Sequence, residues 1–270
     1  MPLPRRTLLQ TAAVLAAAGA STGAASHHPG RIPHKAISIQ LYTLRSLLDA
    51  DLVPTLRQLA DIGYRTVETA GTHGRTAAEF RSVLDDLGLR ATSGHSGLEG
   101  GIDALIEESS ALGHRRVAVP YAEFDTADGW RQFADQLNEA GHRCRRAGLR
   151  FGYHNHDHEF ATVDGHRPFD ILLHRTDPRL VHFELDVYWA VHAGQDPVAL
   201  VDEHRGRFPQ LHVKDRSATG EMVDPGTGTI DFPELFDHAR AKEFIVEHDN
   251  PTDPMRTARV GFRYLRTVRW

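Results

Sequence analysis

The sequence contains a single cysteine, Cys144, among 270 residues. One thiol cannot form an intramolecular disulfide, so the stability of the fold must come from its hydrophobic core. Basic residues are not gathered in blocks or interleaved with aromatics, and the formal net charge is -5. This composition excludes an evident nucleic-acid-binding surface. After the N-terminal segment, no apolar run is long enough to cross a membrane.

The first 25 residues have the pattern of an export signal. Arg5 and Arg6 precede an Ala-rich apolar run over residues 11–20, and small residues follow. This layout is typical of a cleavable secretory signal, and the paired arginines resemble the twin-arginine type. The apolar run is too short for a retained membrane anchor. We predict a twin-arginine-type signal at residues 1–25, a flexible linker at 26–35, and export to the periplasm, cell wall or medium.

From residue 36 to the end, short apolar strand patterns alternate with helical patterns. Four glycines follow helices in the same register, which indicates a repeated strand-helix unit: Gly63, Gly88, Gly113 and Gly148. The predicted strands are 36–43, 64–69, 89–94, 115–120, 149–154, 180–186, 210–214 and 243–247. The predicted helices are 52–62, 77–87, 101–112, 129–147, 168–175, 197–205, 232–240 and 254–268. Eight such units predict an α/β fold with a parallel (β/α)8 TIM barrel over residues 36–270.

The first predicted strand runs into Gln40-Leu-Tyr42-Thr-Leu-Arg45. This segment has no glycine-rich phosphate loop, so the Rossmann-type dinucleotide fingerprint is absent. Strand eight follows a short connection over residues 239–242 without a helix-ending glycine, which suggests a trimmed loop or a locally damaged barrel.

Histidines alternate at the end of the fifth predicted strand, in Phe-Gly-Tyr-His154-Asn-His156-Asp-His158-Glu-Phe. Side chains on a strand alternate between its two faces, so these imidazoles could share one side. Neutral imidazoles that are close together can bind a divalent metal. A His-rich polar loop is the alternative interpretation.

The next three strands end in Asp186, His212 and Glu247, each directly after apolar residues. In a barrel these positions lie at the mouth, where a buried charge is costly unless it is paired or bound to a metal. Each alone could be a helix cap or a rim ion pair. Together with His154 they predict one divalent metal site. Imidazole and carboxylate ligands favour Mn, Co, Zn or Fe over calcium, and manganese is our first choice, with magnesium also considered.

Other polar and aromatic residues at strand ends are candidates for contacts with the substrate. Lys214 lies two positions after the strand-seven histidine and could steady a substrate oxyanion, or form a surface ion pair. Gln40 and Glu68 could bind sugar hydroxyls or satisfy the polar barrel interior. Tyr42 and Trp189 could form an apolar wall against a sugar ring, or pack in the core.

Five motifs resemble the sugar phosphate isomerase/epimerase family, the xylose-isomerase-like TIM barrels. They are QLYTLR at 40–45, YHNHDHEF at 153–160, ELDVYW at 184–189, HVKD at 212–215 and EHDNP at 247–251. The resemblance extends from about residue 36 to the end, with the motifs in the family's order. It implies a small-molecule carbohydrate substrate, one bound divalent metal and a possible homodimer.

In relatives such as the ketose 3-epimerases, Glu, Asp, His and Glu of strands five to eight hold the metal. Asp186, His212 and Glu247 match three of these positions. His154 stands at the position of the family's first Glu, and His156 or Glu159 could take its place. Glu159 is otherwise assigned to substrate binding.

The resemblance implies a metal-dependent sugar isomerase or epimerase that moves a proton beside a carbonyl. Glu247 would keep one acid/base role, and His156, with His95 as the second choice, would supply the other. The predicted export favours an unphosphorylated sugar. A lyase acting on 3-keto-glycosides begins with the same enolisation and is the alternative. A secreted sugar-binding barrel without catalysis is the third hypothesis.

Overall fold

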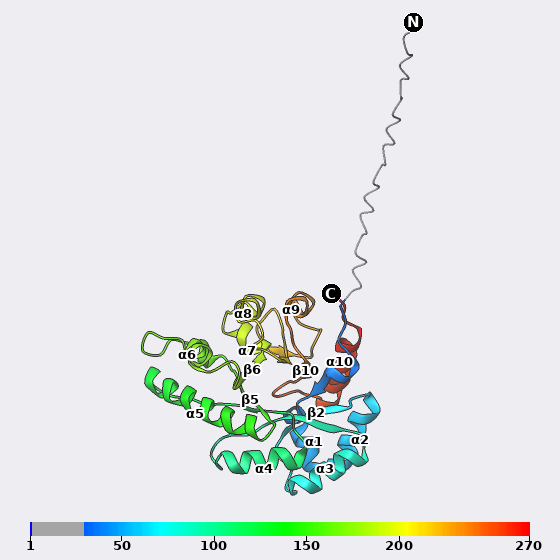
Figure 1. Ribbon diagram of the computed structural model, residues 1–270. Helices are drawn as coiled ribbons and strands as arrows, with labels where there is room; N and C mark the ends of the chain where they lie inside the picture. Colours follow the sequence, from blue (N-terminus) through cyan, green and yellow to red (C-terminus); the bar gives the residue numbers. More distant parts are fainter. Residues whose placement is uncertain (2–29) are drawn as a thin grey trace.

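The computed structural model describes Met1 and residues 30–270 (Figure 1). Eight parallel strands form one sheet in which strands that follow each other in the chain are neighbours. They are β1 Ile37–Ile39, β2 Thr66–Ala70, β3 Arg90–His95, β4 Arg116–Val119, β5 Arg150–His154, β6 Val181–Asp186, β7 Gln210–Val213 and β10 Glu243–Val246. β1 pairs with β10, and a parallel bridge between Gln40 and Glu68 joins the β1 and β2 sides. The predicted (β/α)8 barrel is therefore confirmed.

Helices connect the strands and surround the sheet (Figure 1). They are α1 Arg45–Ala50, α2 Leu52–Ile62, α3 Ala77–Asp86, α4 Ile102–Leu112, α5 Ala127–Arg146, α6 Pro168–Arg175, α7 Val187–His192, α8 Pro197–Glu203, α9 Phe232–His238 and α10 Pro254–Thr267. The eight predicted helices are present with small shifts at their ends. The helices α1 and α7 were not predicted, nor was a hairpin of β8 Asp215–Arg216 with β9 Met222–Val223.

The repeated glycines act as helix caps. Gly63, Gly88, Gly113 and Gly148 have φ angles of 126°, 70°, 84° and 81°. Residues with a Cβ atom rarely adopt this region, whereas glycine enters it without a steric penalty. Each glycine therefore ends one helix and turns the chain towards the following strand, as the sequence pattern predicts.

The first strand is shorter than predicted. β1 ends at Ile39, because the Gln40 side chain accepts a hydrogen bond from the Tyr42 backbone N–H (3.1 Å) and starts the 3₁₀ helix η2 Leu41–Leu44. Gln40 stays buried, whereas Tyr42 is 43 % exposed. The eighth strand is intact: β10 pairs with both β1 and β7, so the short connection before it is a trimmed loop.

The predicted export signal lies outside the described residues apart from Met1, and export stays a prediction. The end of the predicted linker packs on the barrel instead of leaving it. Ile32 is 2 % exposed and belongs to the core, and the Gly30 N–H donates to the Trp270 carbonyl (2.7 Å). The barrel therefore begins a few residues before position 36. Among the described residues, no helix combines the length and apolar character of a membrane span.

The barrel interior carries a buried carboxyl group at the first residue of β10. Glu243 accepts hydrogen bonds from the Thr92 hydroxyl (2.5 Å) and from Gln210 Nε2 (3.1 Å). Burial raises its pKa from an ordinary 4.5 to about 7. The folded chain therefore holds this proton at a pH where the unfolded chain has released it. The resulting stabilisation is present below pH 4.5 and is lost as the pH rises through 7.

We expect Glu243→Gln to raise the free energy of unfolding relative to wild type at pH 8, because the neutral amide removes the cost of ionising a buried group. The gain should be on the order of 1–3 kcal/mol. At pH 4 the two proteins should be close in stability. Urea unfolding at both pH values measures the difference, and an equal effect at both would contradict the raised pKa.

Candidate metal centre and substrate cavity

A cavity of about 460 Å³ opens at the carboxyl ends of the strands. Its lining combines aromatic rings with imidazoles, two carboxylates and one ammonium group: Tyr42, Ala70, His95, Pro120, Tyr121, His154, His156, Trp189, Lys214, Glu247, Asp249 and Asn250. A concave site with aromatic walls and a few convergent polar groups is typical of small-molecule binding.

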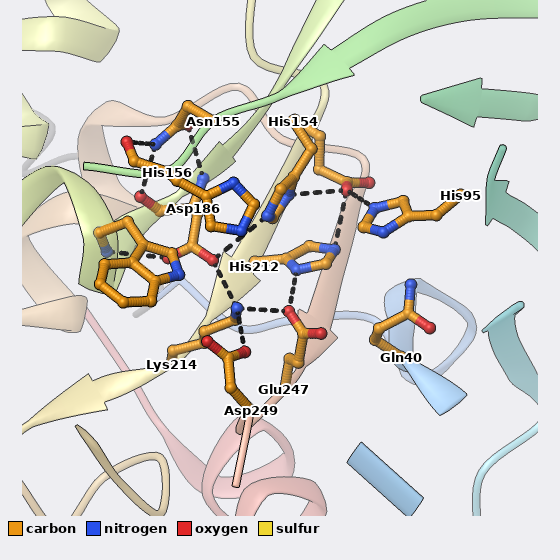
Figure 2. A network of polar contacts seen from close by, with 12 residues as sticks. Gln40, His95, His154, Asn155, His156, Asp186, His212, Lys214, Glu247 and Asp249 are labelled. Atoms are coloured by element: carbon orange, nitrogen blue, oxygen red, sulfur yellow. Dashed lines mark hydrogen bonds and ion pairs between the residues drawn. The ribbon is translucent and has the colours of Figure 1, made fainter. Parts of the chain in front are cut away.

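Four of the predicted residues come together beside this cavity, and we call His154, Asp186, His212 and Glu247 the quartet (Figure 2). His154 and Glu247 line the cavity, and Asp186 and His212 lie behind its lining. Each offers one nitrogen or oxygen, and these four atoms lie within 4.8 Å of one another. His212 Nδ1 is 2.6 Å from Glu247 Oε2, and His154 Nε2 is 3.6 Å from Asp186 Oδ2. All four side chains are buried. Neighbouring strands bring them together: Asp186 and His212 are register partners on β6 and β7.

The quartet fits a divalent metal. Two imidazole nitrogens and two carboxylate oxygens form the donor set that Mn, Fe, Co and Zn accept. Asp186 Oδ2 is buried beside the Lys214 ammonium group (2.9 Å), so a metal in the quartet would share this oxygen with Lys214. In a second group, formed by His95, His154, Glu184 and His212, one nitrogen or oxygen of each residue also lies within 4.8 Å of the others.

Lys214 is buried beside the quartet, where three carboxylates surround its ammonium group (Figure 2). Its Nζ lies 2.9 Å from Asp186 Oδ2, 2.7 Å from Glu247 Oε2 and 2.6 Å from Asp249 Oδ1. Burial alone lowers the pKa of Lys214, but the three carboxylates outweigh burial and hold this pKa well above its ordinary value. The surface ion pair considered from sequence is therefore not formed, and Asp249 is a site residue that the sequence did not single out.

Two further carboxylates, those of Glu68 and Glu184, contact ring nitrogens of His212 and His95. His212 Nε2 is 2.7 Å from Glu68 Oε1 and 2.8 Å from Glu184 Oε1, and His95 Nε2 is 2.7 Å from Glu184 Oε1. Burial lowers the pKa of His212, but the surrounding carboxylates outweigh it and raise this pKa well above its usual value. Sequence reasoning missed Glu184. It lies two positions before Asp186, so the period of two along the strand could have identified it.

Two further predicted residues line the cavity with free polar atoms. His156 Nδ1 and Trp189 Nε1 are buried without a hydrogen-bond partner in the described chain. Burial lowers the pKa of His156 to about 3, so its imidazole is neutral. Tyr42 and His95 also line the cavity. These positions are compatible with the substrate contacts and acid/base roles predicted for them.

Besides Asp186 and His212 of the quartet, three predicted residues are not among those that line the cavity: Gln40, Glu68 and Glu159. Gln40 Nε2 donates to Glu68 Oε1 (2.9 Å), which links β1 to β2. Glu159 accepts from the Tyr153 hydroxyl (2.5 Å) and from the His156 backbone N–H (2.8 Å). Glu159 therefore holds the loop that carries His156, and it does not replace His154 in the quartet. His158 turns away, and its Nε2 is 2.8 Å from the Ala122 carbonyl oxygen.

Comparison with known proteins gives a consistent picture. The family model described as "Xylose isomerase-like TIM barrel" matches residues 56–268. Inosose dehydratase of Geobacillus kaustophilus is 32 % identical over 129 residues, 41 % of each chain. Inosose dehydratase of Clostridium beijerinckii is 25 % identical over 66 % of this chain and 63 % of its own. The chain thus spans less than two thirds of these curated relatives. A solved structure of a sugar phosphate isomerase/epimerase from Parabacteroides distasonis is 27 % identical, with a TM-score of 0.75, over 87 % of this chain and 94 % of that chain.

Proposed function

The chain belongs to the xylose isomerase-like TIM barrel family, and on that premise we propose that it moves a proton at the carbon beside the carbonyl of an unphosphorylated keto-sugar. The reaction would be a metal-dependent isomerisation or epimerisation. The observation that carries this proposal is the convergence of the quartet beside a cavity that His154 and Glu247 line together with other proton-transfer groups. Family membership itself implies a small carbohydrate substrate.

When bound by the quartet, a divalent metal would supply a Lewis acid that makes the C–H bond beside a carbonyl more acidic. Proton movement then falls to side chains that face the cavity. Burial raises the pKa of Glu247, but Lys214 and His212 outweigh it and hold this pKa well below its usual value, so Glu247 is ionised and can accept a proton. His156, neutral and with a free Nδ1, is the partner on the other side of the acid/base pair. Lys214 would stabilise a substrate oxygen by giving up its contact with one of the three carboxylates and contacting that oxygen instead.

The loop over residues 224–230, which follows β9, bears on whether the substrate carries a phosphate group. Its glycine-containing segment presents backbone N–H groups in the manner of an anion cradle. The Asp215 carboxylate already accepts from three of them, on Gly226 (2.9 Å), Gly228 (2.8 Å) and Ile230 (3.3 Å). Because the chain's own carboxylate occupies this cradle, these N–H groups are not available to a phosphate group.

Two exposed tyrosines at the cavity support a sugar ring as the substrate. Tyr42 and Tyr121 are 43 % and 49 % exposed, although large rings are usually buried. The Arg45 guanidinium stacks on the Tyr42 ring at 4.0 Å, and the Tyr121 hydroxyl donates to Glu123 (2.8 Å). Both rings are therefore held in place. Their flat apolar faces suit the C–H face of a carbohydrate ring.

A second candidate function is elimination, and the names of the curated relatives favour it. Both are inosose dehydratases, named for removing water from a keto-polyol. Such a reaction starts with the same proton removal beside a ketone. Neutral His156 would take that proton, and the imidazolium would then give it to the leaving oxygen. The 3-keto-glycoside lyase considered from sequence belongs to this class, with an alcohol in place of water as the leaving group.

A proton-exchange experiment separates these functions. The chain loaded with Mn²⁺ is incubated in D2O with fructose, 3-keto-glucosides and keto-inositols, and ¹H NMR follows each sugar. Deuterium in a recovered or isomerised sugar is the expected result. Loss of water or of the aglycone would support elimination instead. Binding without exchange by any sugar, with the metal present, would overturn both and leave the non-catalytic sugar-binding barrel.

A further inference from the structure

A second cavity, of about 390 Å³, lies at the amino ends of β5, β6 and β7, at the end of the barrel opposite the substrate cavity. Small-molecule sites in proteins usually have volumes of about 300–1,000 Å³. Three arginines line this cavity: Arg145 near the end of α5, Arg150 at the start of β5 and Arg179 in the loop before β6. Among the residues that the structure describes, no carboxylate belongs to the lining.

We propose that this arginine cavity binds a small organic dianion, a phosphate ester or a dicarboxylate, whose charged oxygens contact Arg145 and Arg150. The site is separate from the metal centre, since the two cavities lie at opposite ends of the barrel strands. Binding there does not depend on the reaction proposed above.

Positive charge at the arginine cavity exceeds the negative charge beside it. Asp177 precedes the lining residue Pro178, and its carboxylate is already held by Arg179, whose Nη2 lies 2.7 Å from Asp177 Oδ2. Arg145 and Arg150 form no ion pair with a carboxylate of residues 30–270. Two guanidinium charges are therefore left without a partner here, although the formal net charge of the chain is -5.

A fourth guanidinium group adds to this local excess of positive charge. Arg116 on β4 is the register partner of Arg150 on β5. Its Nε is buried without a hydrogen-bond partner in the described chain. Burial lowers the pKa of Arg116, Glu243 opposes this effect, and the charges of Arg150 and Arg115 lower the pKa further. The arginines thus repel one another at this end of the barrel, and a bound anion would reduce that repulsion.

The lining also indicates the chemical class of the ligand. A guanidinium group presents a planar fork of N–H donors that matches two oxygens of a phosphate or carboxylate group. Two unpaired guanidinium groups therefore suit a ligand with two negative charges. Leu149, Phe151 and Pro178 add an apolar part to the lining, which suits the carbon skeleton of an organic anion better than a bare inorganic ion.

Calorimetric titration at low ionic strength, where salt screens exposed charges least, tests the proposal. Glycerol 3-phosphate and succinate are the two dianion probes, and glycerol and acetate are their neutral and singly charged controls. We expect at least one dianion to bind wild type with one site per chain, with the same affinity with and without Mn²⁺. Glycerol and acetate should not bind measurably. Binding of glycerol 3-phosphate alone would identify a phosphate ester as the ligand, and binding of succinate alone a dicarboxylate.

Three arginine variants locate the site. Arg145→Gln and Arg150→Gln should each bind the dianion about 10-fold more weakly than wild type, because each loses charge-assisted hydrogen bonds to it. Arg146→Gln is the matched control, since Arg146 is exposed on the same helix and does not line the cavity. Arg145 and Arg150 are exposed as well, so all three variants should keep the wild-type circular dichroism spectrum.

Four results would overturn the inference. Absence of binding by both dianions would exclude the site, and equal binding of acetate would exclude recognition of a dianion. Wild-type affinity in Arg145→Gln and Arg150→Gln would place the dianion elsewhere, for example in the substrate cavity. An equal loss of affinity in Arg146→Gln would show only a general attraction of anions to positive charge.

Discussion

Replacing Asp186 or His212 by alanine should remove the divalent metal from the chain and lower kcat/KM for solvent exchange by about a thousandfold or more, since metal stabilisation of developing charge contributes several kcal/mol. Each change deletes one of four donors that lie within 4.8 Å of one another. Asp186→Ala also leaves Lys214 with two carboxylate neighbours in place of three. We therefore expect both variants to lose the metal while they remain folded.

Elemental analysis of untagged wild type and the two variants measures this effect. His182→Ala is the matched control, because His182 lies on the same strand as Asp186 but its Nε2 contacts Gln210 (3.0 Å). About one metal ion per wild-type and control chain, and none in the two variants while circular dichroism is unchanged, is the expected result. Metal content that survives both substitutions would place the ion elsewhere.

Lys214→Met should destabilise the metal-free chain by about 3–5 kcal/mol, the usual cost of removing one partner from a buried ion pair. The side chain is 1 % exposed, and its removal leaves Asp186, Glu247 and Asp249 facing each other without a cation. Burial raises the pKa of Asp186 to about 6, and the loss of the ammonium group raises it further, so a proton neutralises this carboxylate in the variant at pH 6. The loss should therefore be smaller at pH 6 than at pH 8. A divalent metal in the quartet should restore part of the stability.

Urea unfolding with and without Mn²⁺ measures both effects. Lys242→Met is the control, because Lys242 is exposed and surface changes usually alter stability by less than about 0.5 kcal/mol. If Lys214→Met is as stable as wild type without metal, protons rather than the ammonium group neutralise the three carboxylates. If Mn²⁺ stabilises the variant no more than it stabilises wild type, Lys214 and the metal do not compensate the negative charges of the same carboxylates.

The fold was predictable because its signals are local. Apolar strands, amphipathic helices and the capping glycines at Gly63, Gly88, Gly113 and Gly148 each depend on a few neighbouring residues. The errors were local too. β1 was predicted too long because the Gln40 side chain competes with the strand by capping the next turn. α7 was missed because Asp186, assigned to the site, also accepts from the Trp189 backbone N–H and begins a helix.

The quartet was predictable because a general rule places the carboxyl ends of barrel strands at one mouth, so consecutive strand-end ligands must be close. Glu184 and Asp249 were not singled out, since a carboxylate near a site can be a ligand, an ion-pair partner or a surface group, and the sequence does not distinguish these. Gln40, Glu68 and Glu159 were assigned to the substrate, but their hydrogen bonds hold the strands and loop around the site.

The sequence by itself determined the barrel, the order of its strands and the residue types at its mouth, because short-range patterns and a single closure rule are enough for these. Tertiary structure decided which atoms face each other. Glu68 and His212 are 144 positions apart, yet Glu68 Oε1 lies 2.7 Å from His212 Nε2. Lys214 lies among carboxylates from two other strands. Such contacts depend on side-chain directions across the closed barrel, and these follow from the packing of the whole chain.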